Sequence, residues 1–171
     1  MVQIELPRKI CIAESKMEGA ERGVFATSRI EARECIERCP VIALSNQKDR
    51  DRLRRTGLVN YYFLWGKGRD HAAICLGWGS IYNHSFSPNA YYVKDMEALR
   101  MDFFALRTIE EGEEITVNYN GVATDTRPLR IPGIPEAAGG APQPSSRILA
   151  GLLRRGKLMV RKLSLRSVTE D

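Results

Sequence analysis

The sequence predicts a mostly β fold with few short helices, and three observations lead to it. Between residues 10 and 120, short segments rich in Val, Ile, Phe and Tyr alternate with turn-forming residues, which is typical of strands. Helical periodicity in the same region is scarce. No succession of strands and long helices occurs, so a doubly wound fold built from repeated βαβ units is a poor match.

Seven strands are expected, each a β-rich run between turn formers. They are Lys9–Ala13, Arg22–Thr27, Glu34–Leu44, Ala72–Leu76, Ala90–Val93, Leu99–Leu106 and Glu114–Asn118. The best helical candidate is Lys48–Tyr62, whose apolar residues fall roughly on one face, although Gly57 lowers its helix propensity.

Composition divides the chain into residues 1–124 and 125–171. Residues 127–144 hold five prolines and three glycines, which is typical of a linker, and Ser145–Arg166 has the pattern of a marginal amphipathic helix. From Asp125 onward, nine basic and four acidic residues account for the whole net charge of +5. We therefore expect a folded domain over 1–124, and over 125–171 a linker followed by a loosely held basic tail that has this marginal helical pattern. Such a tail suits an acidic protein surface or a weak nucleic-acid contact.

Targeting and metal signals are few. No apolar run reaches the roughly 18 residues that span a bilayer, and the N-terminus lacks the layout of a signal peptide, so we expect an intracellular protein without a membrane contact. The four cysteines show no paired spacing of the kind that binds zinc, and they are too few for a disulfide framework. We interpret them as core residues or free thiols, and expect no metal site.

Three strings carry the chemistry. They are ERGVFAT at residues 21–27, YNHSFSPNA at residues 82–90 and IEEGEEITVNY at residues 109–119. In this order, they resemble the signature segments of SET-domain protein-lysine methyltransferases, in particular N-H-S-x-x-P-N-A and I-x-x-G-E-E-[LI]-T-x-x-Y. The resemblance covers about residues 10–121.

This resemblance implies a fold of several small sheets whose C-terminal segment is threaded in a knot-like way, an exception to the usual connection rules. It also implies methyl transfer from S-adenosylmethionine to a lysine amine in a basic protein, such as a histone, a histone-like protein or a ribosomal protein. The expected compartment is the nucleus in a eukaryote and the cytoplasm in a bacterium. Oligomeric state and the number of methyl groups transferred are left open.

Site residues follow from the resemblance, position by position. Tyr119 matches the catalytic tyrosine, and Arg22, Gly23, Asn83 and His84 match positions that contact the cofactor. The implied lysine channel is lined by one or more of four aromatic residues, which are Tyr61, Tyr62, Phe103 and Phe104. Phe103 and Phe104 are neighbours on one expected strand, so they point to opposite faces.

The chemistry of methyl transfer explains these residue types. A neutral amine attacks the methyl carbon of a sulfonium in line, so alignment lowers the barrier and no metal is needed. A phenol such as Tyr119 can orient the amine, whereas its ordinary pKa near 10 makes it a poor base. Each residue also has a plain structural interpretation: Tyr119 as a strand-end core residue, and His84 as a buried histidine that does not titrate.

The chain departs from the family pattern at two places. Glu21 stands where the first glycine is usual, and no cysteine follows Cys75 to form a zinc module that closes the channel. Residues 122–135, the tail helix, a second subunit or the substrate are candidate covers. These departures support an alternative, a catalytically inactive SET-like protein-binding module. A third hypothesis is a nucleic-acid-binding protein that acts through its basic tail, with a steep salt dependence.

Overall fold

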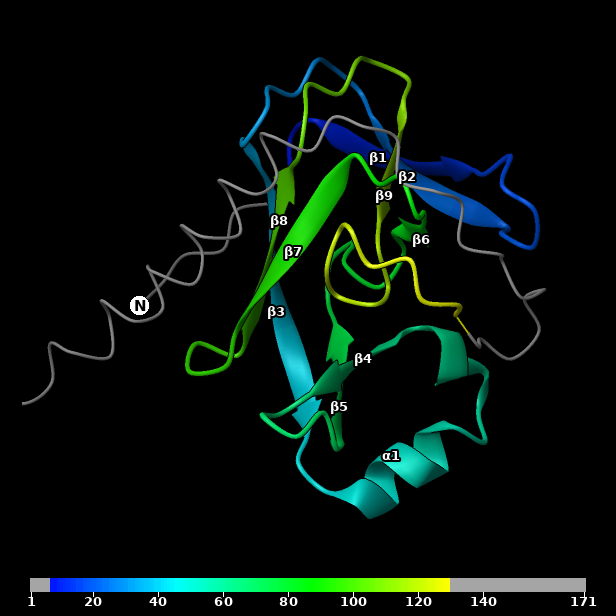
Figure 1. Ribbon diagram of the computed structural model, residues 1–171, viewed down its shortest axis with the longest axis vertical. Helices are drawn as coiled ribbons and strands as arrows, with labels where there is room; N and C mark the ends of the chain where they lie inside the picture. Colours follow the sequence, from blue (N-terminus) through cyan, green and yellow to red (C-terminus); the bar gives the residue numbers. More distant parts are fainter. Residues whose placement is uncertain (1–6, 130–171) are drawn as a thin grey trace, which may run out of the picture. The chain divides into compact units, whose positions relative to one another are not determined.

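The computed structural model describes residues 7–129 of the chain (Figure 1). Within these residues the secondary structure consists mainly of short strands, with one α-helix and one 3-10 helix. In chain order the elements are β1 (Ile10–Glu14), β2 (Arg22–Ala26), β3 (Cys35–Leu44), α1 (Gln47–Leu53), η1 (Gly57–Asn60), β4 (Tyr62–Trp65), β5 (His71–Cys75), β6 (Asn83–His84), β7 (Ala90–Asp95), β8 (Arg100–Ala105) and β9 (Glu114–Val117). The expected mostly β fold is confirmed.

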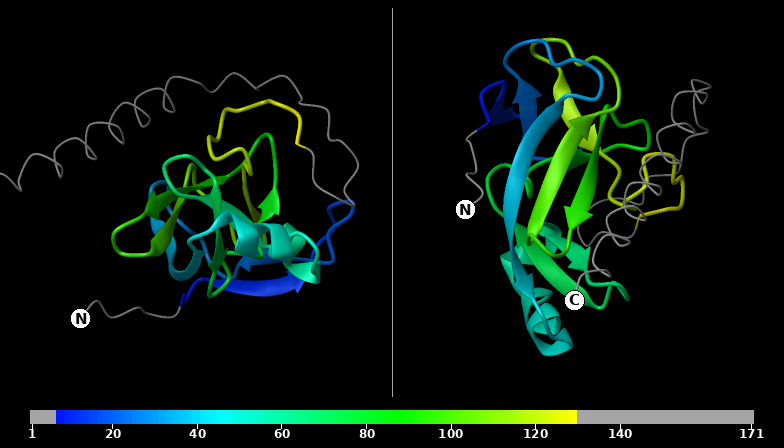
Figure 2. Two further views of the ribbon diagram at one scale, coloured as in Figure 1. Left: turned by 90° about the horizontal axis from the view of Figure 1, so that it is seen from below. Right: turned by 90° about the vertical axis from the view of Figure 1, so that its left-hand side faces the viewer.

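The strands form two sheets. The first has the order β1-β2-β9-β6, and the second has the order β4-β5-β3-β8-β7. Figure 2 shows the long strand β3 running along the second sheet and leading to α1 at its end. In the first sheet, β9 lies between β2, to which it is antiparallel, and β6, to which it is parallel. This placement pairs β9 with β2, about ninety residues earlier in the sequence, and with β6, about thirty residues earlier.

All seven expected strands are present, with bounds that differ from the expectation by at most two residues at either end. Two strands were not expected. One is β6, whose two residues form a strand only because Asn83 pairs with Thr116 and His84 with Val117. The other is β4, in which Tyr62 pairs with Ile74 of β5.

The expected helix Lys48–Tyr62 is wrong in its extent. Helix α1 begins after Asn46, whose side chain accepts a hydrogen bond from the Asp49 N–H at 2.9 Å, and it ends at Leu53. The Thr56 hydroxyl then accepts from the Leu58 N–H at 3.2 Å and begins the short η1. The apolar residues that follow bury area as strand β4 rather than as helix, so tertiary pairing overrides a weak helical pattern.

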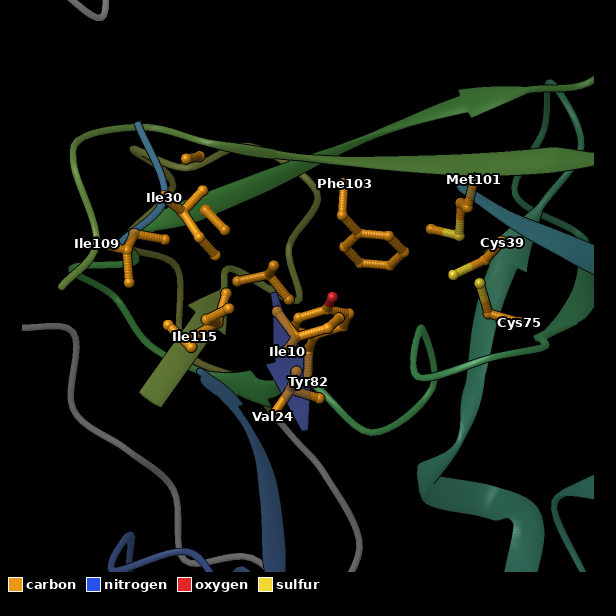
Figure 3. Close-up of a cluster of buried hydrophobic side chains, with 14 of the residues drawn as sticks. Ile10, Val24, Ile30, Cys39, Cys75, Tyr82, Met101, Phe103, Ile109 and Ile115 are labelled. Carbon is orange, nitrogen blue, oxygen red and sulfur yellow. The ribbon is translucent and has the colours of Figure 1, made fainter. Parts of the chain in front are cut away.

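The core lies between the two sheets and is drawn in Figure 3. Its largest fully buried side chains are Tyr82 and Phe103, whose rings stack with centroids 4.5 Å apart and an interplanar angle of 20°. Phe103 comes from β8, where buried and partly buried residues alternate as a half-buried strand requires. Tyr82 directly precedes β6, so this stack anchors the segment that carries Asn83 and His84.

All four cysteines are free, and Cys39 and Cys75 are buried with their sulfur atoms facing each other in the core (Figure 3). The described part of the chain contains no helix that is both long and apolar enough to cross a membrane. Most of the expected linker and the whole of the expected helical tail lie outside the described residues.

Candidate active site

The second and third sequence strings meet at the parallel pairing of β6 with β9. The backbone N–H of Tyr119 donates to Nδ1 of His84 at 3.2 Å, and the N–H of Ser85 donates to the Val117 carbonyl at 3.0 Å. The chain thus passes from β9 into Tyr119 directly beside the Asn83–His84 pair. The structure therefore brings Asn83, His84 and Ser85 of the second string beside Tyr119 of the third.

The hydroxyl of Tyr119 is held by the backbone before β6. It donates a hydrogen bond to the Tyr82 carbonyl at 2.7 Å. Burial, and then the neighbouring phenols of Tyr92 and Tyr61, raise the pKa of Tyr119 to about 12. The phenol is therefore protonated at neutral pH, with lone pairs available to accept a hydrogen bond.

Tyr92 belongs to this aromatic site although the sequence analysis did not single it out. Burial raises the pKa of Tyr92 to about 12, and its ring packs edge-on against Phe63 with centroids 5.2 Å apart. The ring centroids of Tyr92 and Phe103 lie 5.9 Å apart. In the sequence, Tyr92 could be recognised only as one of two adjacent tyrosines on the expected strand Ala90–Val93. Nothing in that position distinguished it from Tyr91.

The four aromatic residues proposed for the channel lie in different surroundings. Tyr61 is near enough to Tyr119 to raise its pKa, and Phe103 is fully buried in the core that supports Tyr82. Phe104 stacks instead on Tyr91, with centroids 5.5 Å apart, on the other side of β8. The remaining one, Tyr62, accepts a hydrogen bond from the Arg54 side chain at 3.3 Å in an exposed position.

His84 is neutral, and one of its two ring nitrogens lacks a hydrogen-bond partner among the described residues. Burial lowers the pKa of His84 to about 4, so the imidazole carries one proton at neutral pH. Its Nδ1 accepts from the Tyr119 N–H, which places that proton on Nε2. Nε2 is buried and has no hydrogen-bond partner among residues 7–129. A buried donor without a partner is costly, and a bound ligand is one way to satisfy it.

The first string joins the same site through the half-buried carboxylate of Glu114. Nδ2 of Asn83 donates both to the Arg22 carbonyl at 2.9 Å and to Oε1 of Glu114 at 2.7 Å. The hydroxyl of Ser15 lies 3.0 and 2.9 Å from the two oxygens of the same carboxylate. Gly23 lies against this group, because a Cβ at residue 23 would be 2.2 Å from Oε1 of Glu114.

The side chain of Glu21, the residue that departs from the family pattern, is 88% exposed. It reaches the neighbouring Arg22 guanidinium at 4.0 Å, and that side chain is itself 54% exposed. The substitution therefore places a carboxylate in solvent rather than in the cluster around Asn83, and the loop accommodates it.

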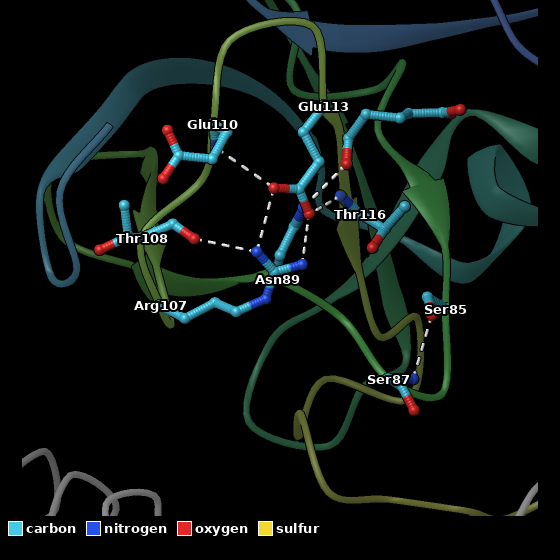
Figure 4. Close-up of polar contacts among 9 residues, drawn as sticks. Ser85, Ser87, Asn89, Arg107, Thr108, Glu110, Glu113 and Thr116 are labelled. Atoms are coloured by element: carbon cyan, nitrogen blue, oxygen red, sulfur yellow. Dashed lines mark hydrogen bonds and ion pairs between the residues drawn. The ribbon is translucent and has the colours of Figure 1, made fainter. Parts of the chain in front are cut away.

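Asn89 of the second string holds the third string in place (Figure 4). Its Nδ2 donates to the Glu114 carbonyl at 2.8 Å and to Glu113 Oε1 at 3.1 Å, and its Oδ1 accepts from the Thr116 N–H at 2.8 Å. Glu113 also forms an ion pair with Arg107, which lowers the pKa of this carboxyl. Two glutamates of the third string, Glu113 and Glu114, are thus bonded to other side chains of the domain.

The chain after Tyr119 is fastened beside the site. Nδ2 of Asn118 donates to the Asp125 carbonyl at 2.7 Å, and Nδ2 of Asn120 donates to the Arg127 carbonyl at 2.8 Å. Asp125 and Arg127 form an ion pair at 2.5 Å. These bonds fold residues 120–127 back onto Asn118 and Asn120, next to Tyr119. Residues 122–129 are the described part of the segment 122–135, which is one of the candidate covers of the channel. Among residues 7–129, no group of three or more His, Cys, Asp or Glu side chains is arranged to hold a metal ion.

Comparison with known proteins agrees with this geometry. The SET domain family matches residues 21–120. The chain is 36% identical over 98 residues to a histone-lysine N-methyltransferase of Schizosaccharomyces pombe specific for H3 lysine-37, which covers 57% of this chain and 65% of that protein. It is 36% identical over 118 residues to an H3 lysine-36-specific histone-lysine N-methyltransferase of Saccharomyces cerevisiae, covering 65% of this chain and 16% of that protein.

A solved structure supports the same assignment. The crystal structure of a candidate histone methyltransferase of Plasmodium falciparum matches with a TM-score of 0.53 and 31% identity, and the match covers 67% of this chain and 95% of that one. The chain belongs to the SET-domain protein-lysine methyltransferase family, and the relatives named above are histone-lysine N-methyltransferases.

Proposed function

We propose that this protein transfers a methyl group from S-adenosylmethionine to a lysine side chain of a histone, with histone H3 as the first substrate to test. The observation that carries the proposal is the convergence of the protonated Tyr119 hydroxyl with Asn83 and His84 at the β6–β9 pairing, inside a matched SET domain. The fungal relatives act on histone H3, which makes the nucleus the proposed compartment.

The residues at this site fit the proposed cofactor. Both hydrogens of Asn83 Nδ2 are used within the domain, which leaves its Oδ1 as an acceptor suited to the ammonium of the cofactor's methionine end. The exposed Arg22 guanidinium suits the carboxylate at the same end. The buried Nε2–H of His84 is a donor that a ligand acceptor would satisfy. When bound, S-adenosylmethionine supplies a methyl group on a positively charged sulfur.

Tyr119 has an orienting role in this proposal. Its hydroxyl donates to the Tyr82 carbonyl, so its oxygen faces an incoming amine as an acceptor. An amine that donates one N–H to this oxygen keeps its lone pair free for the methyl carbon, and holding that direction lowers the barrier. Because its pKa is about 12, Tyr119 is not the base that deprotonates lysine.

Lysine reaches the site best in its neutral form. Phe63 and Phe103 pack against Tyr92 close to Tyr119, so the surroundings are mostly apolar with few groups to solvate an ammonium. Desolvation lowers the pKa of a lysine from its ordinary value near 10.4. These aromatic side chains therefore favour loss of a proton from the lysine ammonium to solvent before the amine is aligned.

The test is methyl transfer from labelled S-adenosylmethionine to histone H3 and to nucleosomes. Tyr119→Phe is the test variant, and Tyr91→Phe is the matched control, since its ring stacks on Phe104 on the other side of β8. We expect Tyr119→Phe to lower the rate about 10- to 100-fold, which corresponds to about 1.4–2.7 kcal/mol of alignment. We expect Tyr91→Phe to retain the native rate.

Calorimetry with the cofactor separates the ways in which this proposal can fail. Cofactor binding without labelling of H3 would contradict the substrate assignment. The absence of both labelling and cofactor binding would contradict the enzymatic proposal and favour a SET-like protein-binding module. Equal rates for the native chain and Tyr119→Phe would remove Tyr119 from the reaction.

A further inference from the structure

The carboxylate of Glu114 connects three segments that are distant in sequence. Ser15 follows β1, Asn83 opens β6 and Glu114 opens β9, and the three side chains are joined by hydrogen bonds of 2.7 to 3.0 Å. Ser15 and Glu114 are 99 residues apart in the chain. Since Ser15 contacts both carboxylate oxygens, Glu114 is held in one orientation.

The hydrogen-bond arrangement determines which way the amide of Asn83 faces. An amide nitrogen has two hydrogens, and in Asn83 one is directed to the Arg22 carbonyl and the other to Oε1 of Glu114. If the amide were rotated by 180°, Oδ1 would meet two acceptors and both hydrogen bonds would be lost. Oδ1 is therefore the atom of this amide that remains for a ligand.

Gly23 leaves the space that this arrangement needs. A Cβ on residue 23 would lie 2.2 Å from Oε1 and 2.8 Å from Cδ of Glu114, and 3.0 Å from Nδ2 of Asn83. The glycine of the first string thus accommodates the Glu114 carboxylate and the Asn83 amide together. This packing links all three sequence strings through a single carboxylate.

From this geometry we infer that Glu114 is a positioning residue for the cofactor. It holds the Asn83 amide so that Oδ1 accepts a hydrogen bond from the α-ammonium of S-adenosylmethionine. The inference rests on the proposed function, because it assigns a direction to one cofactor contact. Glu114 acts through Asn83 and does not itself touch the cofactor.

The experiment compares two ligands by calorimetry with the full chain. One is S-adenosylhomocysteine, and the other is its analogue with hydrogen in place of the α-amino group. The native chain should bind the first ligand more tightly, and this ratio of affinities measures the contact to the amino group. Glu114→Gln should reduce the ratio about tenfold, because a Gln side chain can donate to a rotated Asn83 amide as well as accept from it.

A double-mutant cycle tests whether Glu114 acts through Asn83. In the Asn83→Ala background the ratio should already be low, and adding Glu114→Gln should change it less than about twofold. The control is Glu113→Gln, which removes the neighbouring carboxylate that bonds Arg107 and Asn89 and should leave the ratio unchanged. If Glu114→Gln fails to fold, Ser15→Ala carries the same test with a reduction of about two- to threefold.

The outcomes separate this inference from the proposed function. A native chain that binds neither ligand would contradict the proposed function and this inference with it. A native chain that prefers the amino-bearing ligand, together with a Glu114→Gln variant that weakens both ligands equally, would reduce Glu114 to a structural residue. An undiminished effect of Glu114→Gln in the Asn83→Ala background would also overturn the positioning role.

Discussion

Replacement of Gly23 by alanine tests the packing at the centre of the site. The backbone of Gly23 does not require glycine, because its φ lies outside the left-handed range, so any cost must come from the added methyl group. That methyl would lie 2.2 Å from Oε1 of Glu114, well inside the closest approach of real Cβ atoms. Glu114 must therefore move.

The cost follows from the bonds that this movement breaks. Oε1 of Glu114 accepts from Asn83 at 2.7 Å and from Ser15 at 3.0 Å, and a hydrogen bond to a charged group contributes about 1.5–3 kcal/mol. Losing both would cost about 3–6 kcal/mol. The alanine also restricts the unfolded chain, which offsets about 0.4–1 kcal/mol of this cost. We expect Gly23→Ala to lower the free energy of unfolding by about 2–6 kcal/mol.

Urea unfolding followed by circular dichroism measures this change. Gly57→Ala is the matched control, since nothing lies within 4 Å of the added Cβ and its φ is also ordinary, and it should be neutral or slightly stabilising. In a Glu114→Ala background the clash is absent, so Gly23→Ala should then cost little. If Gly23→Ala costs the same in both backgrounds, the proposed clash with Glu114 is refuted.

Three further predictions concern other parts of the site. Tyr119→Phe should lower the methylation rate without changing the shape of the rate's pH profile between pH 7 and 10. The reason is that the pKa of Tyr119 is about 12, so the native phenol does not ionise in this range. A profile that changes shape would indicate that Tyr119 acts as a base. Asn89→Ala should lower the free energy of unfolding by about 3 kcal/mol, since it leaves the Thr116 N–H and other buried groups without a partner, and a loss below about 1 kcal/mol would contradict this. Hydrogen bonds from Arg127 lower the pKa of Asp125 to about 2, so the stability from this pair should be fully present above about pH 4 and lost as the pH falls through 2, which carboxyl chemical shifts measured against pH would follow.

Strands were the most predictable part of this protein, for a local reason. In β8 the residues Met101, Phe103 and Ala105 are buried while their neighbours are partly buried, so the period of two is visible in sequence. The region around Tyr62 was less predictable. Its aromatic residues suit either a helix face or a strand, and pairing with β5 decided between them.

The site was predictable where its residues stand in recognisable strings. Tyr119, Asn83 and His84 were chosen by resemblance, and the structure brings all three together, although their roles remain predictions to be tested. The sequence analysis gave Glu114 no role beyond its place in the third string. Its carboxylate is bonded by Asn83 and by Ser15, and Ser15 is 99 residues away and belongs to none of the three strings.

From the sequence alone we could predict a mostly β chain that resembles the SET-domain proteins, because side-chain alternation, turn formers and short motifs are local properties. The catalytic role of Tyr119 stays a prediction. Only the tertiary structure decided that β9 lies between β2 and β6, and hence which polar groups face one another. The direction of the Asn83 amide and the bonding of Glu114 depend on contacts of about 3 Å between distant segments. No local pattern encodes such contacts, because they form only when the whole chain packs.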